Sequence, residues 1–286
     1  MRNMVIGLVV ALFAISSGSA SELGTTLTRI SETGQFNIGY RVSEPPMSFE
    51  DSSGNVVGYS VDLCEAIAAA VKQKLDRPDV VVNYIGVTAE NRFDKVQSGE
   101  IDILCGATTM TLSRSERVDF TYLTFATGGT LLSLKENSVA NVTALKGKRV
   151  AVVDDTTTIE ALRRVLSGLL IDAEIVPIAS AQEGMQMLDA GDVDAFASDQ
   201  VVLIGQVITR ESGKEYSLSQ ELFSYEPFAL ASTYDDAEFQ LLANRAISQL
   251  SRSGQIAAIY TKWFGNFSKN PPTILRALYE MNAIPE

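Results

Sequence analysis

The chain has 286 residues, of which 46% are hydrophobic and 20% charged, a globular composition long enough for two lobes. Its formal net charge is −12, and Lys and Arg are scattered along the sequence, which argues against nucleic acid as a partner. The sequence contains no histidine and two cysteines, so it excludes His-dependent nucleophilic triads and the usual zinc sites, and we expect neither a metal nor a cofactor.

The first residues predict an export signal. One basic residue, Arg2, precedes an apolar run over 4–15, and small residues follow up to Ala20. The run is shorter than the roughly 17 to 25 residues that a transmembrane helix needs, so cleavage near Ala20 is favoured over a membrane anchor. We therefore expect 1–20 to be a signal peptide and the mature chain to be exported and soluble.

The first part of the mature chain alternates between strand and helix patterns. Strand patterns cover 36–41, 80–85 and the apolar run that starts at Ile101, and helix patterns cover 60–75, with Ser60 as candidate N-cap, and 90–97. This alternation is typical of a parallel α/β sheet, whose ligands bind at the carboxyl ends of the strands. Arg41 and the residues after Cys105 fall at such ends.

The segment 99–120 predicts a binding site for a small anion. A turn at Gly99 leads into a short buried strand, which is followed by small and hydroxyl residues and then by Arg114 and Arg117. Cys105 ends this strand and Cys64 lies in the preceding helix pattern. An exported protein can form that disulfide, but two separately buried thiols fit the pattern equally well, so the pairing stays open.

A second unit follows an extended, Gly-interrupted connector over 119–134. Its expected elements are strands at 149–153, 174–178 and 194–197 and helices at 159–166 and 181–188. Residues 188–194 repeat the pattern of 96–102, a helix that ends at a glycine before an acidic turn and a strand. Either the two halves are related lobes, or both use a turn that is common in α/β proteins.

The order of the elements predicts a discontinuous first lobe. We expect lobe 1 to comprise 21–132 and 230–286, and lobe 2 to comprise 133–229. Short extended pieces after Ser217 return the chain to lobe 1, where two amphipathic helices and a Pro-punctuated tail complete it. Two crossings between lobes form a hinge, a geometry suited to closure around a ligand.

Five segments carry a resemblance to a known family. They are GYRVSEPPMSFEDSSGNVVGYSVDLCEAI, VQSGEIDILCGATTMTLSRSERVDFT, LKGKRVAVVDDTTT, LDAGDVDAFASDQ and GQIAAIYTKWFG. In this order they resemble the periplasmic amino-acid-binding proteins of bacterial ABC transporters, and within them the glutamate/aspartate-binding branch. The resemblance implies a two-lobed type II periplasmic-binding fold of class α/β, a periplasmic location, a monomer, and delivery of an amino acid to a membrane permease.

The resemblance also assigns the groups that hold the common part of an amino acid. Arg114 matches the arginine that grips the α-carboxylate, a role suited to its planar fork, and Thr109 assists there. The backbone at Ala107 accepts from the ammonium, and Asp199 pairs with it from lobe 2. Thr157 reaches the ligand from a helix N-terminus, although the adjacent threonines could instead only cap that helix, and Asp199 could cap the helix from Gln200.

Arg41 and Arg92 determine the expected ligand class. They match two arginines that point at the ligand's side-chain carboxylate in the dicarboxylate branch, although by position each could be a surface charge. If both face a closed cleft, a neutral ligand leaves them unpaired at a cost of roughly 3 to 5 kcal/mol. A protein carboxylate beside either arginine weakens that preference. Three alanines, Ala89, Ala107 and Ala181, replace polar residues of the branch, which allows broader specificity.

Three functions remain in competition. The first is a binding protein for glutamate or aspartate that closes about its hinge, with no catalytic residue. The second is a general amino-acid-binding protein. The third is a periplasmic dehydratase on the same fold, for which only Asp199 or Glu90 offers a titratable acid in the expected cleft.

Overall fold

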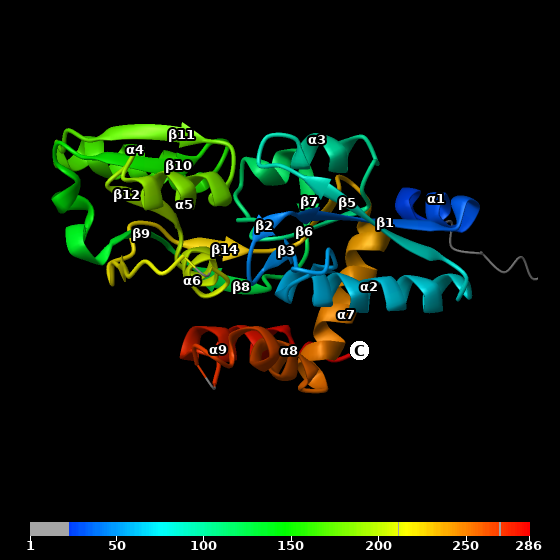
Figure 1. Ribbon diagram of the computed structural model, residues 1–286. Coiled ribbons are helices and arrows are strands. Elements are labelled where there is room, and N and C mark those ends of the chain that lie inside the picture. The colour runs from blue at the N-terminus through cyan, green and yellow to red at the C-terminus, as the bar shows by residue number, and fades with distance from the viewer. Residues whose placement is uncertain (1–22, 211, 269) are drawn as a thin grey trace, which may run out of the picture.

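The computed structural model describes residues 23–210, 212–268 and 270–286, so the predicted signal peptide at 1–20 lies outside the described residues. The described chain forms two lobes that lie side by side, each a twisted sheet flanked by helices (Figure 1). The α/β class indicated by the strand and helix patterns and the two-lobed type II periplasmic-binding fold implied by the resemblance are therefore both confirmed.

The sheet of lobe 1 has the order β5-β1-β6-β15-β7. Its strands are β1 (Gln35–Arg41), β5 (Val81–Val87), β6 (Ile103–Cys105), β7 (Val118–Phe120) and β15 (Ala231–Thr233). The first three run parallel, with β1 between β5 and β6, whereas β15 is antiparallel to both β6 and β7. The chain returns from lobe 2 to insert β15, which makes lobe 1 discontinuous in sequence.

The sheet of lobe 2 has an equivalent order, β11-β10-β12-β9-β13. Its strands are β9 (Gly129–Leu134), β10 (Arg149–Val153), β11 (Glu174–Ile178), β12 (Ala195–Asp199) and β13 (Tyr216–Leu218). Here β10 lies parallel between β11 and β12, and β9 pairs antiparallel with β12. In each lobe the first βα strand is therefore the middle one of the three parallel strands. The carboxyl ends of β1, β6, β10 and β12 provide the positions expected to bear ligand groups.

Two short strands connect the lobes. β8 (Phe125–Thr127) and β14 (Glu226–Phe228) pair antiparallel, and in Figure 1 they run between the two sheets. A small sheet of β2 (Ser43–Glu44), β3 (Ser48–Glu50) and β4 (Val56–Val57) lies beside them at the edge of lobe 1. This arrangement gives the hinge pair and the β1–β2 corner direct access to the space between the lobes.

Helices cover both sheets. They are α1 (Thr25–Thr33), α2 (Tyr59–Leu75), α3 (Arg92–Gln97), α4 (Thr157–Leu169), α5 (Ala181–Ala190), α6 (Gln200–Ile208), α7 (Ala237–Arg252), α8 (Gln255–Phe264) and α9 (Thr273–Asn282), with 3-10 turns at Arg114–Glu116, Lys135–Asn137 and Val142–Leu145. The sequence reading missed α9 and described it as a Pro-punctuated tail. Pro272 stands at the N-cap of this helix, before its first turn, where the missing N–H breaks no hydrogen bond within the helix.

Aromatic side chains fill the core beneath the hinge. Tyr59 is fully buried, its ring contacts Phe125 and Phe264 edge-on, and its hydroxyl donates to the backbone carbonyl of Thr124 at 2.9 Å. The side chain of Tyr59 therefore belongs to the core of lobe 1 and does not line the cleft. Its burial ties α2 and α8 to the strand that leads into the hinge.

The aromatic pair Phe49 and Trp263 lies nearer the surface. The two rings meet edge to face with centroids 5.9 Å apart. Trp263 is half-buried, packs against the hydrophobic core and donates its indole N–H to Asp62 at 2.8 Å. One part of the indole packs against the ring of Phe49, while its N–H group has a hydrogen-bond acceptor in Asp62.

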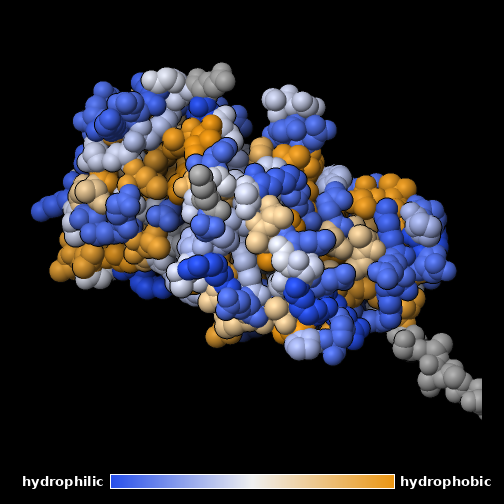
Figure 2. Space-filling view, turned by 90° about the horizontal axis from the view of Figure 1, so that it is seen from below, coloured by the Kyte–Doolittle hydropathy of each residue, from blue (hydrophilic) through white to orange (hydrophobic). Residues whose placement is uncertain are grey.

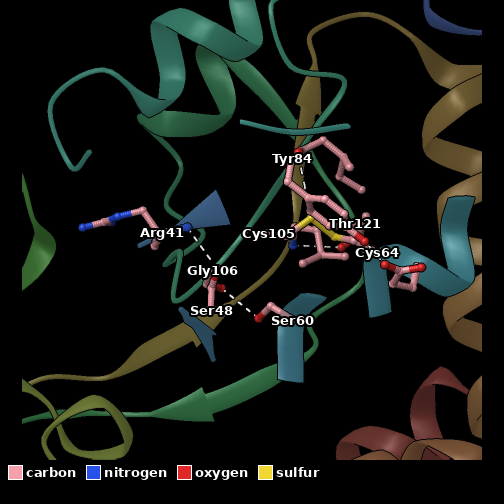
Figure 3. The surroundings of a disulfide bond; sticks show 11 residues. Arg41, Ser48, Ser60, Cys64, Tyr84, Cys105, Gly106 and Thr121 are labelled. Carbon is pink, nitrogen blue, oxygen red and sulfur yellow. Dashed lines mark hydrogen bonds between the residues drawn. A yellow bond between two sulfur atoms is a disulfide. The ribbon is translucent and has the colours of Figure 1, made fainter. Parts of the chain in front are cut away.

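A disulfide joins Cys64 in α2 to Cys105 at the end of β6, which resolves the pairing that the sequence left open (Figure 3). Ser60 is not the N-cap of α2, because the helix begins at Tyr59 and the cap position is Gly58. The Ser60 hydroxyl instead donates to the carbonyl of Gly106 at 3.0 Å. Both contacts fix the chain just before Ala107, and in Figure 3 the side chain of Arg41 extends away from the disulfide.

Hydrophobic side chains on the face seen in Figure 2 form separate patches among hydrophilic ones on both lobes. Across the described residues, the helices are too short or too polar to span a membrane.

Candidate functional site

The predicted site residues line one cavity between the lobes. The cavity has a volume of about 30 Å³. Its lining consists of Arg41, Glu44, Arg92, Ala107, Thr109, Arg114, Val153, Thr156, Thr157, Thr158, Ala181, Ala197, Ser198, Asp199 and Val202. The structure thus brings all seven residues selected from the sequence to the same place.

Arg41 lies at the carboxyl end of β1 and is paired within the protein. Its side chain is buried, and Nη2 lies 2.8 Å from Oε1 of Glu44, three residues further along. The second oxygen of Glu44 accepts a hydrogen bond from the backbone N–H of Ala107 at 3.2 Å. Glu44 therefore neutralises Arg41 and also orients the loop that begins at Ala107.

Arg92 is the first residue of α3, and unlike Arg41 it has no carboxylate partner in the part of the chain that the structure describes. It is only 3% exposed, and Nη2 donates to the carbonyl of Asp155 in lobe 2 at 2.9 Å. Among the described residues, Nε and Nη1 of this side chain have no hydrogen-bond partner. Burial lowers the pKa of Arg92 to about 9, with the positive charges of Arg41 and Arg114 adding to the shift. The group remains a cation at neutral pH and is available to an anion.

Arg114 begins the 3-10 turn after β6. Its Nη1 donates to the carbonyl of Thr109 at 2.8 Å, and the guanidinium lies over the ring of Phe93, 5.1 Å from the centroid. Burial lowers the pKa of Arg114, while the charges of Glu226 and Asp199 oppose that shift. One hydrogen bond and one ring contact hold the guanidinium plane, which leaves further N–H groups of the fork available to a bound carboxylate.

Asp199 ends β12 and faces Arg114 and Arg41 across the cavity. Burial raises the pKa of Asp199 well above its ordinary range, and the nearby carboxylates Glu226 and Glu44 add to the rise. Its Oδ1 has no hydrogen-bond partner among the described residues. The carboxyl occupies the N-cap position of α6 but makes no side-chain cap bond, so the capping alternative is not realised.

Threonine hydroxyls from both lobes meet above the cavity. Thr156 caps α4 by accepting from the N–H of Ile159, which leaves the hydroxyl of Thr157 free of that task. Thr157 Oγ1 and Thr109 Oγ1 lie 3.2 Å apart, and both donate to Oε2 of Glu226, at 2.7 and 2.6 Å. A lobe 1 residue, a lobe 2 residue and a hinge residue therefore form one cluster.

The sequence did not point to two further buried carboxylates at this site, Glu44 and Glu226. Glu44 falls in a segment that reads as a chain break before two prolines, and Glu226 falls in a short extended piece described only as a return crossing. Their exposed fractions are 9% and 1%. An acid inside an otherwise apolar Tyr-Glu-Pro-Phe strand was the available signal for Glu226, since a buried carboxylate requires partners.

Comparisons with known proteins agree with this geometry. The chain matches the family model "Bacterial extracellular solute-binding proteins, family 3" over residues 36–266. A "Glutamate/aspartate import solute-binding protein" of Salmonella typhimurium is 31% identical over 279 residues, which cover 98% of this chain and 91% of the relative. An "L-glutamate/L-aspartate-binding protein" of Pseudomonas aeruginosa is 32% identical over 257 residues, which cover 90% and 85%.

A solved structure extends the likeness to three dimensions. An ancestral arginine-binding protein bound to glutamine superposes with a TM-score of 0.72 at 29% identity, covering 81% of this chain and 98% of that one. The family resemblance inferred from the five sequence segments is thereby confirmed. The chain belongs to the bacterial extracellular solute-binding proteins, family 3.

Proposed function

We propose that the chain captures glutamate or aspartate in the periplasm by closing its lobes and delivers the ligand to the permease of an ABC transporter. Support comes from relatives whose names specify these two amino acids and from a cavity lined by arginines and an acid. An α-amino acid with an acidic side chain offers two carboxylates and one ammonium. The cavity offers groups that match each of the three.

The observation that carries this proposal is the state of Arg92. Its guanidinium is buried at the cavity, with Nε and Nη1 lacking partners among the described residues. A buried donor without an acceptor is costly, and a hydrogen bond to a charged group contributes ~1.5–3 kcal/mol. A side-chain carboxylate supplies that acceptor together with the opposite charge. A neutral amide supplies only the acceptor.

The other end of the ligand uses the remaining groups. In this proposal the Arg114 fork holds the α-carboxylate, with the hydroxyls of Thr109 and Thr157 beside it. Asp199, whose Oδ1 lacks a partner in the described part of the chain, pairs with the ammonium, and the backbone at Ala107 accepts from it as well. The ligand then bridges lobe 1 and lobe 2, which favours the closed arrangement.

Glu44 limits how strongly this site discriminates. Because Glu44 already pairs with Arg41, the preference for an acidic side chain rests on Arg92 instead of on two unpaired arginines. The discrimination against glutamine or asparagine then falls to about ten- to a hundredfold. The same pair favours the second candidate, a general amino-acid-binding protein, over a strictly selective one.

Calorimetric titration of the ligand-stripped protein with glutamate, aspartate, glutamine and asparagine distinguishes these two candidates. We expect the acids to bind at least tenfold tighter than the amides. Arg92→Met removes most of that difference, whereas Arg276→Met, on the exposed side of α9, leaves it unchanged. Equal affinity for glutamate and glutamine in the wild-type protein selects the general binder instead.

Catalysis is the remaining candidate, and Asp199 is the observation that favours it. A buried carboxyl whose pKa is raised in a ligand cleft is a chemically competent acid. We propose that this carboxyl binds the ammonium and does not catalyse a reaction. Incubating the protein with prephenate or arogenate and finding no product supports binding, while formation of product establishes a dehydratase.

A further inference from the structure

Glu226 of the hinge strand β14 receives three hydroxyl donors in a buried setting. Oε2 accepts from Thr109 at 2.6 Å and from Thr157 at 2.7 Å, and Oε1 accepts from Ser224 at 2.6 Å. Ser224 is itself held in place, because its hydroxyl accepts from the backbone N–H of Gly129 at 2.9 Å. The carboxylate is therefore fixed to lobe 1, to lobe 2 and to the hinge at once.

This carboxylate forms part of a wall between two spaces. Thr109 and Thr157 line both the small cavity and an open groove of about 900 Å³. Glu226 lines the groove only, as do the cations Arg163 and Arg164 of α4. A rotation of the Glu226 side chain toward the groove would thus open the wall and bring the carboxylate toward positive charge and solvent.

The hydroxyls at this wall cannot serve two carboxylates. Each threonine hydroxyl has a single proton to donate, and both protons are directed at Glu226. In the proposed function the same hydroxyls assist the α-carboxylate of the ligand beside Arg114. Two carboxylates at one position also repel each other. Ligand and Glu226 are therefore alternatives for the same donors.

We propose that Glu226 is an internal competitor for the α-carboxylate site, which an amino-acid ligand must displace from Thr109 and Thr157. This inference rests on the proposed function and adds an affinity-setting residue to it. Without ligand, Glu226 connects the two lobes through these threonines and favours a closed arrangement. That arrangement reduces the population of open, binding-competent protein, so the apparent affinity falls by the same fraction.

The test compares Glu226→Gln with wild-type protein by calorimetry, using L-glutamate and isoglutamine, the α-amide of glutamate. The substitution keeps the shape of the side chain and removes its charge. We expect Glu226→Gln to bind L-glutamate about tenfold tighter. In this variant the ligand no longer has to break a charge-assisted hydrogen bond between a threonine hydroxyl and the Glu226 carboxylate, and the loss of one such bond corresponds to about that change in affinity. Isoglutamine should gain far less, because it carries no α-carboxylate to compete. Glu221→Gln, an exposed residue of the same connection, is the charge-matched control and should change neither affinity.

Unchanged or weaker glutamate binding by Glu226→Gln overturns the proposal, since weaker binding means that Glu226 holds the ligand's ammonium. Ser224→Ala is the second variant, because it releases one anchor of Glu226 without changing the charge and should produce a smaller gain in the same direction. If the wild-type protein binds no acidic amino acid, the proposed function fails on its own. Small-angle X-ray scattering of ligand-free protein then tests whether Glu226 holds the lobes closed. A larger radius of gyration for Glu226→Gln than for wild-type protein supports this role, and identical scattering curves refute it.

Discussion

In both lobes an aspartate stands immediately before the third parallel strand in the chain and is hydrogen-bonded to the first one. In lobe 1 the N–H of Asp102 donates to the carbonyl of Asn37 at 2.8 Å, and its carboxylate accepts from the N–H of Asn37 at 2.7 Å. In lobe 2 Asp194 makes the same pair of bonds with Arg149, both at 2.8 Å. The repeated sequence pattern thus corresponds to a repeated set of contacts, which favours related lobes over chance reuse of a common turn.

The lobes diverge where these strands end. β6 leads through Ala107 to the arginine turn at Arg114, and its last residue is joined to α2 by the disulfide. β12 passes directly into α6 with Asp199 at the junction, and the structure describes no disulfide in lobe 2. The two lobes therefore share the arrangement of their strands and helices but differ in the charged side chains that they place at the cleft. One lobe supplies the cations of the cleft and the other supplies an acid, which together suit a zwitterion.

Removing the main cation of lobe 1 should have the largest effect. Arg114→Ala deletes the proposed partner of the α-carboxylate and leaves a buried carboxylate unpaired in the complex, at a cost of roughly 3 to 5 kcal/mol. Calorimetry should therefore show glutamate affinity reduced by at least a hundredfold. Arg117→Ala, whose exposed side chain pairs with Asp94 outside the cavity, should change affinity less than threefold. Comparable losses in both variants would contradict the assignment.

The sequence was sufficient for the scaffold and for the strand-end residues. Strand and helix periodicity located the βα units and placed Arg41 at a carboxyl strand end, while the binding roles of Arg41 and Asp199 came from the family resemblance. Partnership was not readable in the same way. Glu44 is only three residues from Arg41, but the two belong to successive short strands, and that spacing predicts a contact only within a helix. Glu226 returns from far along the chain. Long-range pairing of polar groups depends on tertiary geometry, which local patterns do not encode.

Removing the disulfide should destabilise lobe 1 selectively. The bond closes a loop with a sequence separation of 41 residues, and such crosslinks typically contribute about 2–4 kcal/mol. The double variant Cys64→Ala/Cys105→Ala should lose stability of that order in urea unfolding. Hydrogen exchange should speed up in β6 and α2 while β10 and β12 keep their protection. Equal loss of protection in both lobes would show that the lobes unfold as one unit.

Asp199 should make the ligand-free protein less stable as pH rises. Its pKa in the folded protein is raised above the unfolded value of ~3.9, so the folded state binds the proton more tightly. The stabilisation is complete below the unfolded pKa and is lost as pH rises through the folded pKa. Asp199→Asn removes this loss, which urea unfolding at a series of pH values measures. Asp172→Asn, an exposed lobe 2 control, should retain the wild-type slope. A slope unchanged in Asp199→Asn would assign the pH dependence to other groups.

The glycines of the two equivalent turns should produce the smallest and most evenly matched effects. Gly99 and Gly191 have φ of +72° and +77°, and a Cβ at either position meets no atom within 4 Å among the described residues. Alanine therefore adds backbone strain without a clash, about 1 kcal/mol in each lobe.

Gly168 in α4 serves as a control. It also has room for a Cβ but lies inside a helix, where alanine stabilises by up to about 1 kcal/mol. Urea unfolding should thus give equal losses for Gly99→Ala and Gly191→Ala and a gain for Gly168→Ala. A loss several times larger in one turn than in the other would mean that the two turns share a sequence pattern but not the same structural role.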